Sequence, residues 1–280
     1  MSFFAVAFML ILAVCMFYGQ SLYKKKGVEG GKTLTIICGV LIIVTAVYIN
    51  LLKSDIDHSA IHREKAYQRA QAIVLSNTLT NMYVGGGKCL VIHNTVSEKH
   101  KEEVLKLVDS FKEGFGGKVT QMVPVPIKDY PGDEALMEEA MMENTAVDFN
   151  KIFKENADCD VIIIMVPLPN SPDELMKMDL FKLVQDPEDE KKWIKDPSKK
   201  YPLLGVFNGY IGNLEPFFLD NLIGAMSLWK PDPEIDEKPV PENVKTAFDK
   251  RYLIVTPDNI IGTKQKFPSL FPKKKTPDAK

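Results

Sequence analysis

The sequence has little of what binding to nucleic acids, binding to metals or covalent catalysis requires. Among its 280 residues, 35 Lys and Arg are offset by 37 Asp and Glu, which gives a formal net charge of −2. This near-neutral balance argues against a nucleic-acid partner, because recognition of the phosphate backbone needs a clustered basic surface. Only four cysteines are present, and no Cys-x-x-Cys or Cys/His cluster indicates a metal centre. We therefore expect no cofactor and no bound metal.

Motifs of common enzyme classes are also missing. The sequence has no Gly-x-Ser-x-Gly elbow, in which a nucleophilic serine sits on a sharp turn. The glycines at 85–87 precede a predicted strand, whereas a phosphate loop or dinucleotide fingerprint follows one. Gly209 and Gly212 follow a strand, but the third glycine and the lysine of such motifs are absent. We predict that the protein is not an enzyme.

Two long stretches contain no charged residue, Ser2–Gly19 and Thr33–Leu52. As helices rising about 1.5 Å per residue, both are long enough for a hydrocarbon core of roughly 30 Å. The connection Gln20–Lys32 carries four lysines and one glutamate, a pattern typical of a cytoplasmic loop. We therefore predict a transmembrane hairpin within residues 1–52, with the lipid bilayer as partner of residues 2–19 and 33–52. Both termini and the domain that follows are expected outside the cytoplasmic (inner) membrane.

A cleaved signal peptide followed by one anchor helix is the alternative to the hairpin. It is disfavoured because no basic side chain precedes Phe3. Cleavage would also leave the basic loop on the wrong side of the remaining helix.

The remaining chain predicts a helical stalk at 53–84, an α/β domain at 85–260 and a Lys- and Pro-rich tail at 261–280. Helical patterns, including Glu98–Glu113 and Asn213–Leu228, alternate with short apolar strands. Alternating strands and helices favour a doubly wound, mainly parallel five-stranded sheet in the order 2-1-3-4-5. The five predicted strands are Cys89–Ile92, Val119–Val125, Val161–Val166, Leu203–Phe207 and Tyr252–Val255.

Three segments resemble one lobe of the type 1 periplasmic sugar-binding proteins. They are KCLVIHNTVSEKHKEEVLKLVDSFKEGFGGKVTQMVPV from Lys88, NKIFKENADCDVIIIMVPLP from Asn150 and RYLIVTPDNI from Arg251. The first has the order strand, polar turn, long helix, glycine and strand. The second is a helix that ends in a short turn before an apolar strand, and the third is a later strand and turn. The resemblance implies a single α/β lobe and a sugar as ligand.

Polar residues follow the predicted strands at the edge where ligands of open α/β sheets bind. Asn, Thr and Tyr side chains form hydrogen bonds with polar ligands without adding charge. The alternative is that these residues are ordinary turn formers, because loops are polar by default. Asp258 and Asn259, after the fifth strand, are expected at the same edge. The candidate ligand-binding residues are His93, Asn94, Thr95, Asn170, Ser171, Asn208 and Tyr210.

Cys89 and Cys159 lie at the starts of the first and third predicted strands, which are neighbours in the predicted order. They would either form one disulfide in an oxidising compartment or remain two buried free thiols.

Two functions fit these expectations. The first is a membrane-anchored extracytoplasmic interaction module, a non-catalytic part of an envelope assembly that docks on another protein or on its own copy. The charged run 186–200, which holds Trp193, favours this function as an exposed insertion. The alternative is a domain that senses or binds a small ligand, a sugar or an anion, at the strand ends.

Overall fold

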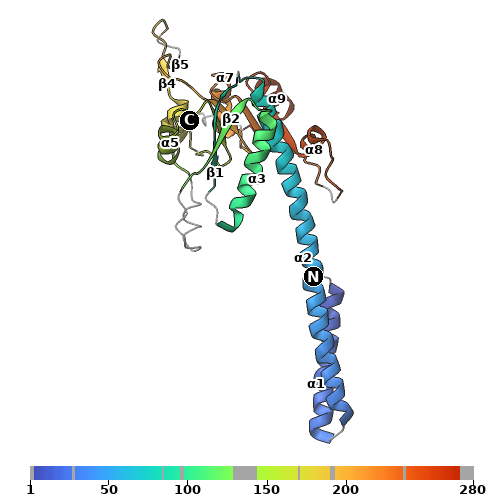
Figure 1. The fold of residues 1–280 in the computed structure, drawn as a ribbon. Helices are drawn as coiled ribbons and strands as arrows, with labels where there is room; N and C mark the ends of the chain where they lie inside the picture. The colour runs from blue at the N-terminus through green and yellow to red at the C-terminus, as the bar shows by residue number, and fades with distance from the viewer. Residues whose placement is uncertain are drawn as a thin grey trace, which may run out of the picture. The chain divides into compact units, whose positions relative to one another are not determined.

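The computed structural model describes residues 3–26, 29–83, 85–94, 98–128, 144–169, 171–189, 193–235 and 238–271. The chain divides into two compact units, Met1–Glu64 and Lys65–Lys280. The helices are α1 Phe3–Lys26, α2 Glu29–Thr80, α3 Glu98–Phe115, α5 Ala146–Glu155, α6 Pro172–Lys177, α7 Glu215–Leu219, α8 Val244–Arg251 and α9 Ile260–Lys266, with 3-10 turns η1 Asp179–Phe181, η2 Gly212–Leu214 and η3 Pro268–Leu270. The strands are β1 Gly87–His93, β2 Val119–Pro126, β3 Val161–Ile164, β4 Leu183–Gln185, β5 Trp193–Lys195, β6 Leu203–Val206, β7 Ala225–Trp229 and β8 Tyr252–Val255 (Figure 1).

The first unit consists of α1 and the N-terminal part of α2. The Thr35 hydroxyl lies between the two helices and is 3.3 Å from Met16 O and 2.9 Å from Gly31 O. Leu12 and Cys38 are buried in this unit. Other apolar side chains of both helices are exposed, among them Ile11, Val14, Phe17, Ile36, Val40 and Ile43.

Within the described residues, no helix combines the length and the apolar character that crossing a membrane requires. This finding contradicts the predicted transmembrane hairpin of residues 2–19 and 33–52. It also contradicts the bilayer as a partner and the inner-membrane location with an extracytoplasmic domain.

The second unit is built on a six-stranded sheet in the order β2-β1-β3-β6-β7-β8, beside a separate two-stranded sheet, β4-β5. The strands from β2 to β7 are parallel, and β8 pairs antiparallel with β7. Cys89 of β1 pairs with Val161 of β3, which pairs with Leu203 of β6. The carboxyl ends of these strands therefore lie at one edge of the sheet.

The predicted five-stranded sheet is wrong in its second half. The segment Asn213–Leu228 was predicted as one helix, but α7 ends at Leu219 and β7 begins at Ala225. Asn221 has φ 54° and ends the helix, because Asn tolerates the left-handed conformation better than most residues. A short buried apolar run fits a strand and a helix equally well by periodicity, so the pattern alone did not reveal β7.

Strand β8 is antiparallel because its connection from β7 stays at one end of the sheet. Trp229, the last residue of β7, pairs with Tyr252, the first residue of β8. The amides of Lys230 and Glu234 donate to the carbonyls of Arg251 and Lys250, each at 2.9 Å. The chain between the strands is thus fixed beside the end of α8 and does not cross back over the sheet as a parallel connection requires.

Helices cover both faces of the sheet in the second unit (Figure 1). Alternate residues of β1 and β3 point to opposite faces, as the pleat requires. Val91 and Ile163 pack in one buried cluster with residues of α2 and α3. Ile92 and Ile162 pack in another, with residues of α5, α6, α7 and α9. Two-sided burial explains why these strands are apolar at every position.

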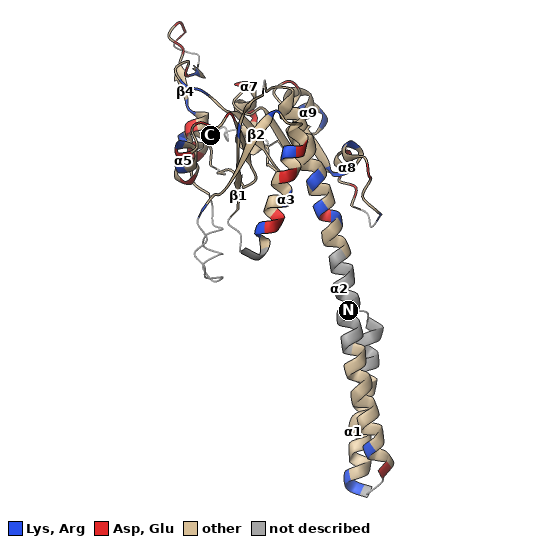
Figure 2. Ribbon diagram, in the orientation of Figure 1, with Lys and Arg blue, Asp and Glu red and all other residues tan. Residues whose placement is uncertain are grey.

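The C-terminal part of α2, from Lys65, belongs to this core. Leu75 and Leu79 are fully buried, and a Cβ added at Gly205 of β6 would lie 2.7 Å from Leu79 Cδ1. A glycine in β6 therefore lets α2 pack directly on the strand. Ion pairs join the exposed side of α2 to α3, Lys65–Glu103 at 2.5 Å and Arg69–Glu113 at 2.9 Å. Figure 2 shows basic and acidic residues along α3 and the adjoining part of α2.

Truncation of Leu79 tests this packing. We expect Leu79→Ala to lower the free energy of unfolding by about 2–5 kcal/mol, because it leaves a cavity between α2 and β6. Leu105→Ala makes the same change on α3 at a side chain that is 44% exposed, and it should cost no more than about 0.5 kcal/mol. Urea denaturation of the full-length variants measures both values. Equal losses would contradict the placement of α2 in the core.

Candidate functional site

A cleft of about 220 Å³ opens at the carboxyl ends of β3 and β6. One wall follows β3 and the other follows β6, while Leu175 of α6 and residues of η2 complete it. The sheet order places this cleft one strand away from the β1/β3 switch point of the fold. The lining residues are Val166, Pro167, Leu168, Pro169, Leu175, Val206, Asn208, Gly209, Tyr210, Asn213 and Leu214.

The wall after β6 is held in an uncommon backbone conformation. Asn208 has φ 56°, in the left-handed region that Asn enters more readily than other side chains. Its backbone N–H donates to Ser227 Oγ at 3.4 Å, and the next N–H, of Gly209, donates to Ser227 O at 3.0 Å. A Cβ at Gly209 would lie 2.4 Å from Met226 Sδ. The turn therefore packs directly on β7.

The described lining is mostly apolar, with three polar residues and no charged side chain. The polar residues are Asn208, Tyr210 and Asn213, whose side chains carry amide or hydroxyl groups that can donate and accept hydrogen bonds. Tyr210 is 71% exposed. No Asp, Glu, Lys, Arg or His is among the described residues that line it. The prolines and aliphatic side chains make up the rest of the walls.

The structure brings together only part of the predicted ligand-binding set. Asn208 and Tyr210 line the cleft. His93 is the last residue of β1, Asn94 follows it and Ser171 comes after β3, but none of the three is in the lining. Thr95 and Asn170 lie outside the described residues. The sequence reasoning missed Asn213, whose only signal was its place after the glycine-containing turn that ends at Gly212.

Asp258 and Asn259 lie at the opposite edge, because β8 runs antiparallel to the other strands. Asn259 accepts from Thr256 N at 2.9 Å and donates to Ile254 O at 3.1 Å, so it closes the turn after β8. Asp258 lines a separate cleft of about 260 Å³ with Met82, Leu203, Asn221, Gly224 and Pro257. The expectation that residues 258 and 259 share an edge with Asn208 is therefore wrong.

His93 ends β1 in a half-buried position. Its Nδ1 donates to Asn94 O at 2.7 Å, and its carbonyl accepts from Ile127 N at 2.8 Å. Burial lowers the pKa of His93 from its ordinary value of 6.5, because partial removal from water disfavours the charged imidazolium. His93 is therefore neutral near pH 7, with Nε2 as its unprotonated nitrogen.

The thiols at the amino edge of the sheet do not fit nucleophilic chemistry. Cys89 and Cys159 are free and buried, and burial raises the pKa of each. A protonated thiol is a poor nucleophile and a poor metal ligand. Cys89 packs in the cluster on the α2/α3 face, whereas Cys159 packs in the cluster on the other face.

Ion pairs surround these thiols at the starts of β1 and β3. Lys88 pairs with Asp158, and Lys200 pairs with Asp160. Asp160 Oδ2 also accepts from the backbone N–H of Lys88 at 3.3 Å. The lysine partners lower the pKa of both carboxyl groups, so this edge is fixed by ion pairs between strand ends. In the described part of the chain, no three His, Cys, Asp or Glu side chains are grouped so that they could hold a metal.

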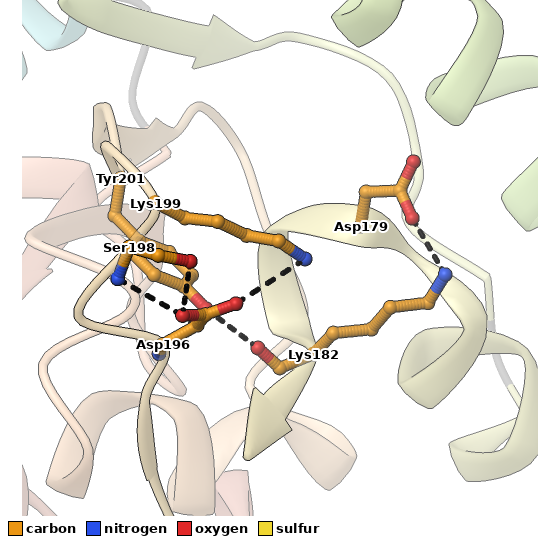
Figure 3. A network of polar contacts seen from close by, with 6 residues as sticks. All are labelled: Asp179, Lys182, Asp196, Ser198, Lys199 and Tyr201. Carbon is orange, nitrogen blue, oxygen red and sulfur yellow. Dashed lines mark hydrogen bonds and ion pairs between the residues drawn. The ribbon is translucent and has the colours of Figure 1, made fainter.

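A polar network closes the base of the β4–β5 hairpin (Figure 3). Tyr201 OH donates to Lys182 O at 2.7 Å and accepts from Asp196 N at 3.2 Å. Asp196 Oδ1 accepts from both N and Oγ of Ser198, at 2.9 and 2.6 Å. The hairpin presents Trp193, which is 59% exposed. None of these residues lines the β3/β6 cleft, so the network supports the hairpin and not the site.

No protein-family model matches the chain, and no curated protein matches it by sequence. Solved structures do resemble it. An arabinose-binding protein from Geobacillus stearothermophilus has 16% identity and a TM-score of 0.36, with 70% of this chain and 62% of that chain covered. A sugar-binding protein of a sugar transporter from Bacillus halodurans has 12% identity and a TM-score of 0.37, with 69% of this chain and 62% of that chain covered. A carbohydrate-transporter solute-binding protein from Agrobacterium radiobacter, in complex with D-arabinose, has 14% identity and a TM-score of 0.36, with 74% of this chain and 62% of that chain covered.

The weak resemblance to solute-binding proteins stated from the sequence is confirmed by these structures. The chain spans 62% of the length of the structures it matches. TM-scores this low assign neither a ligand nor an activity to the chain.

The lowered pKa of His93 predicts a loss of stability in mild acid. The unfolded chain takes up a proton below the ordinary pKa of 6.5, while the folded chain resists protonation until its own lower pKa is reached. The contribution of His93 is thus fully present above pH 6.5, falls as the pH drops below it and levels off below the folded pKa.

Urea denaturation of wild type and His93→Gln between about pH 7.5 and pH 5 measures this contribution. The free energy of unfolding of the wild type should fall relative to that of the variant on acidification. If the free energy of unfolding of the wild type, relative to that of the variant, stays constant or rises toward pH 5, the fold does not disfavour protonation of this imidazole.

Proposed function

We propose that the domain formed by the second unit binds a small, uncharged ligand rich in hydroxyl groups, without catalysis, in the β3/β6 cleft. The observation that carries this proposal is the composition of the cleft. Three polar side chains, Asn208, Tyr210 and Asn213, meet a wall of proline and aliphatic residues. Binding sites for small molecules combine mostly apolar walls with a few placed polar groups.

The size of the cleft favours a ligand smaller than a nucleotide or a peptide. Pockets for drug-sized molecules have volumes of about 300–1,000 Å³, and this cleft has about 220 Å³. A single sugar ring or a short polyol suits this volume. The C–H faces of such a ligand would lie against Pro167 and Pro169, and its hydroxyl groups would exchange hydrogen bonds with the amides.

The absence of charged groups from the described lining argues against an anion as ligand. A bound phosphate or carboxylate needs basic side chains or helix N-termini to offset the loss of its hydration. The amide and phenol groups of this cleft provide neutral donors and acceptors in similar numbers. That balance suits hydroxyl groups, which also donate and accept.

Substitution of Asn208 tests the site. We expect the full-length protein to bind at least one member of a panel of D-arabinose, D-ribose, D-glucose and glycerol in titration calorimetry. Asn208→Gly keeps the left-handed backbone accessible and removes only the side-chain amide, so it should weaken binding about threefold to tenfold.

Asn221→Gly is the matched control, because Asn221 also has a positive φ, 54°, and lies outside this cleft. It should bind as the wild type does. If the wild type binds no member of the panel, the proposed site is contradicted. Equal affinities of the two variants for the sugar would contradict it as well. Tighter binding of inorganic phosphate or citrate than of any sugar would contradict the proposed ligand class.

A further inference from the structure

A buried polar contact joins α2 to the wall of the cleft. Gln71 Nε2 donates to Ser227 Oγ at 3.0 Å, and both side chains are fully buried. The same oxygen accepts from the backbone N–H of Asn208 at 3.4 Å. A hydroxyl oxygen has two acceptor lone pairs, so the two donors occupy both.

Gln71 is an unusual choice for its position. Its neighbour Ala72 and the residue one turn on, Leu75, pack in the apolar cluster between α2 and the sheet. Gln71 Oε1 has no hydrogen-bond partner among the described residues, and a buried polar atom without a partner is destabilising. The unpaired oxygen therefore offsets part of the stability that the bond between Gln71 and Ser227 contributes. We therefore look for the role of Gln71 in the hydrogen bond that its side-chain amide donates to Ser227.

We propose that Gln71 is a positioning residue for the cleft, acting through Ser227 on the turn that contains Asn208. This inference rests on the proposed function for its purpose, because Asn208 lines the cleft assigned to the ligand. The Gln71 amide fixes the Ser227 hydroxyl so that one of its lone pairs points at the Asn208 N–H. That hydrogen bond, with the bond from Gly209 N to Ser227 O, holds Asn208 in its left-handed conformation.

Without the Gln71 amide, the Ser227 hydroxyl would rotate freely and form a weaker bond with Asn208. The turn would then sample other conformations, and the Asn208 side chain would leave the cleft for part of the time. A ligand that needs this side chain would bind in proportion to the fraction of molecules in the competent conformation. Gln71 thus acts on affinity without touching the ligand.

Amide hydrogen exchange, followed by NMR in the full-length protein, tests the positioning role without a ligand. Gln71→Met removes the amide at similar volume, and Ser227→Ala removes the hydroxyl. We expect exchange of the backbone N–H of Asn208 to become about threefold to tenfold faster in both variants. The Ile163 amide, in the centre of β3, reports global opening, and its exchange should change less than that of Asn208.

Ser76→Ala is the control. Ser76 lies on the same helix, is fully buried, and its Oγ has no hydrogen-bond partner among the described residues. It removes a buried hydroxyl from α2 without touching the contact with Ser227. Exchange of the Asn208 amide in this variant should match the wild type.

Exchange of Asn208 in Gln71→Met that is as slow as in Ser76→Ala would overturn the proposal. So would equal acceleration of Asn208 and Ile163, because this would reduce the role of Gln71 to global stability. In titrations with the sugar that the wild type binds best, Gln71→Met should bind more weakly than Ser76→Ala, because a smaller fraction of its molecules holds Asn208 in the competent conformation. If no sugar binds the wild type, the proposed function fails, and the exchange rates alone decide whether Gln71 positions the turn.

Discussion

The two-sided burial of the parallel strands β1, β3 and β6 is the constraint on which the second unit depends. A parallel sheet presents an apolar face on each side, and both faces must be covered. The helices α2 and α3 cover one face, and α5, α6, α7 and α9 contribute to the cover of the other. The strand ends are then the places where loops from different elements can meet around an open space. The cleft beside Asn208 is thus a consequence of how the sheet is covered.

The strands that the sequence pattern located best are those with this two-sided burial. The runs at Cys89, Val161 and Leu203 are continuous and apolar, and they lie side by side in the sheet. The pattern did not reveal β7, because its five residues are as apolar as the helix before them. It also did not reveal the direction of β8, which is set by backbone hydrogen bonds between the connection and α8. Such contacts leave no periodic signal in the chain.

The sequence could predict those residues of the candidate site that come directly after a strand. Asn208 and Tyr210 could be named because they come directly after a recognisable strand. Gln71 and Ser227 could not, because a polar residue within an apolar stretch has no assigned partner until the fold brings the two together. Their separation in the chain is 156 residues. The volume of the cleft and the lack of charge in its described lining likewise arise only when four segments converge.

The place of α2 in the core has a consequence for synthesis on the ribosome. Tyr67, Leu75 and Leu79 leave the ribosome long before β7 and β8, the strands that help to cover this helix. At about 5–20 residues per second, the 156 residues between Gln71 and Ser227 take roughly 8 to 30 seconds to make. Throughout that interval the apolar side of α2 has no complete sheet to pack against. Until its last strands are made, the nascent chain can cover this side of α2 only in part, through α3 and the strands already synthesised.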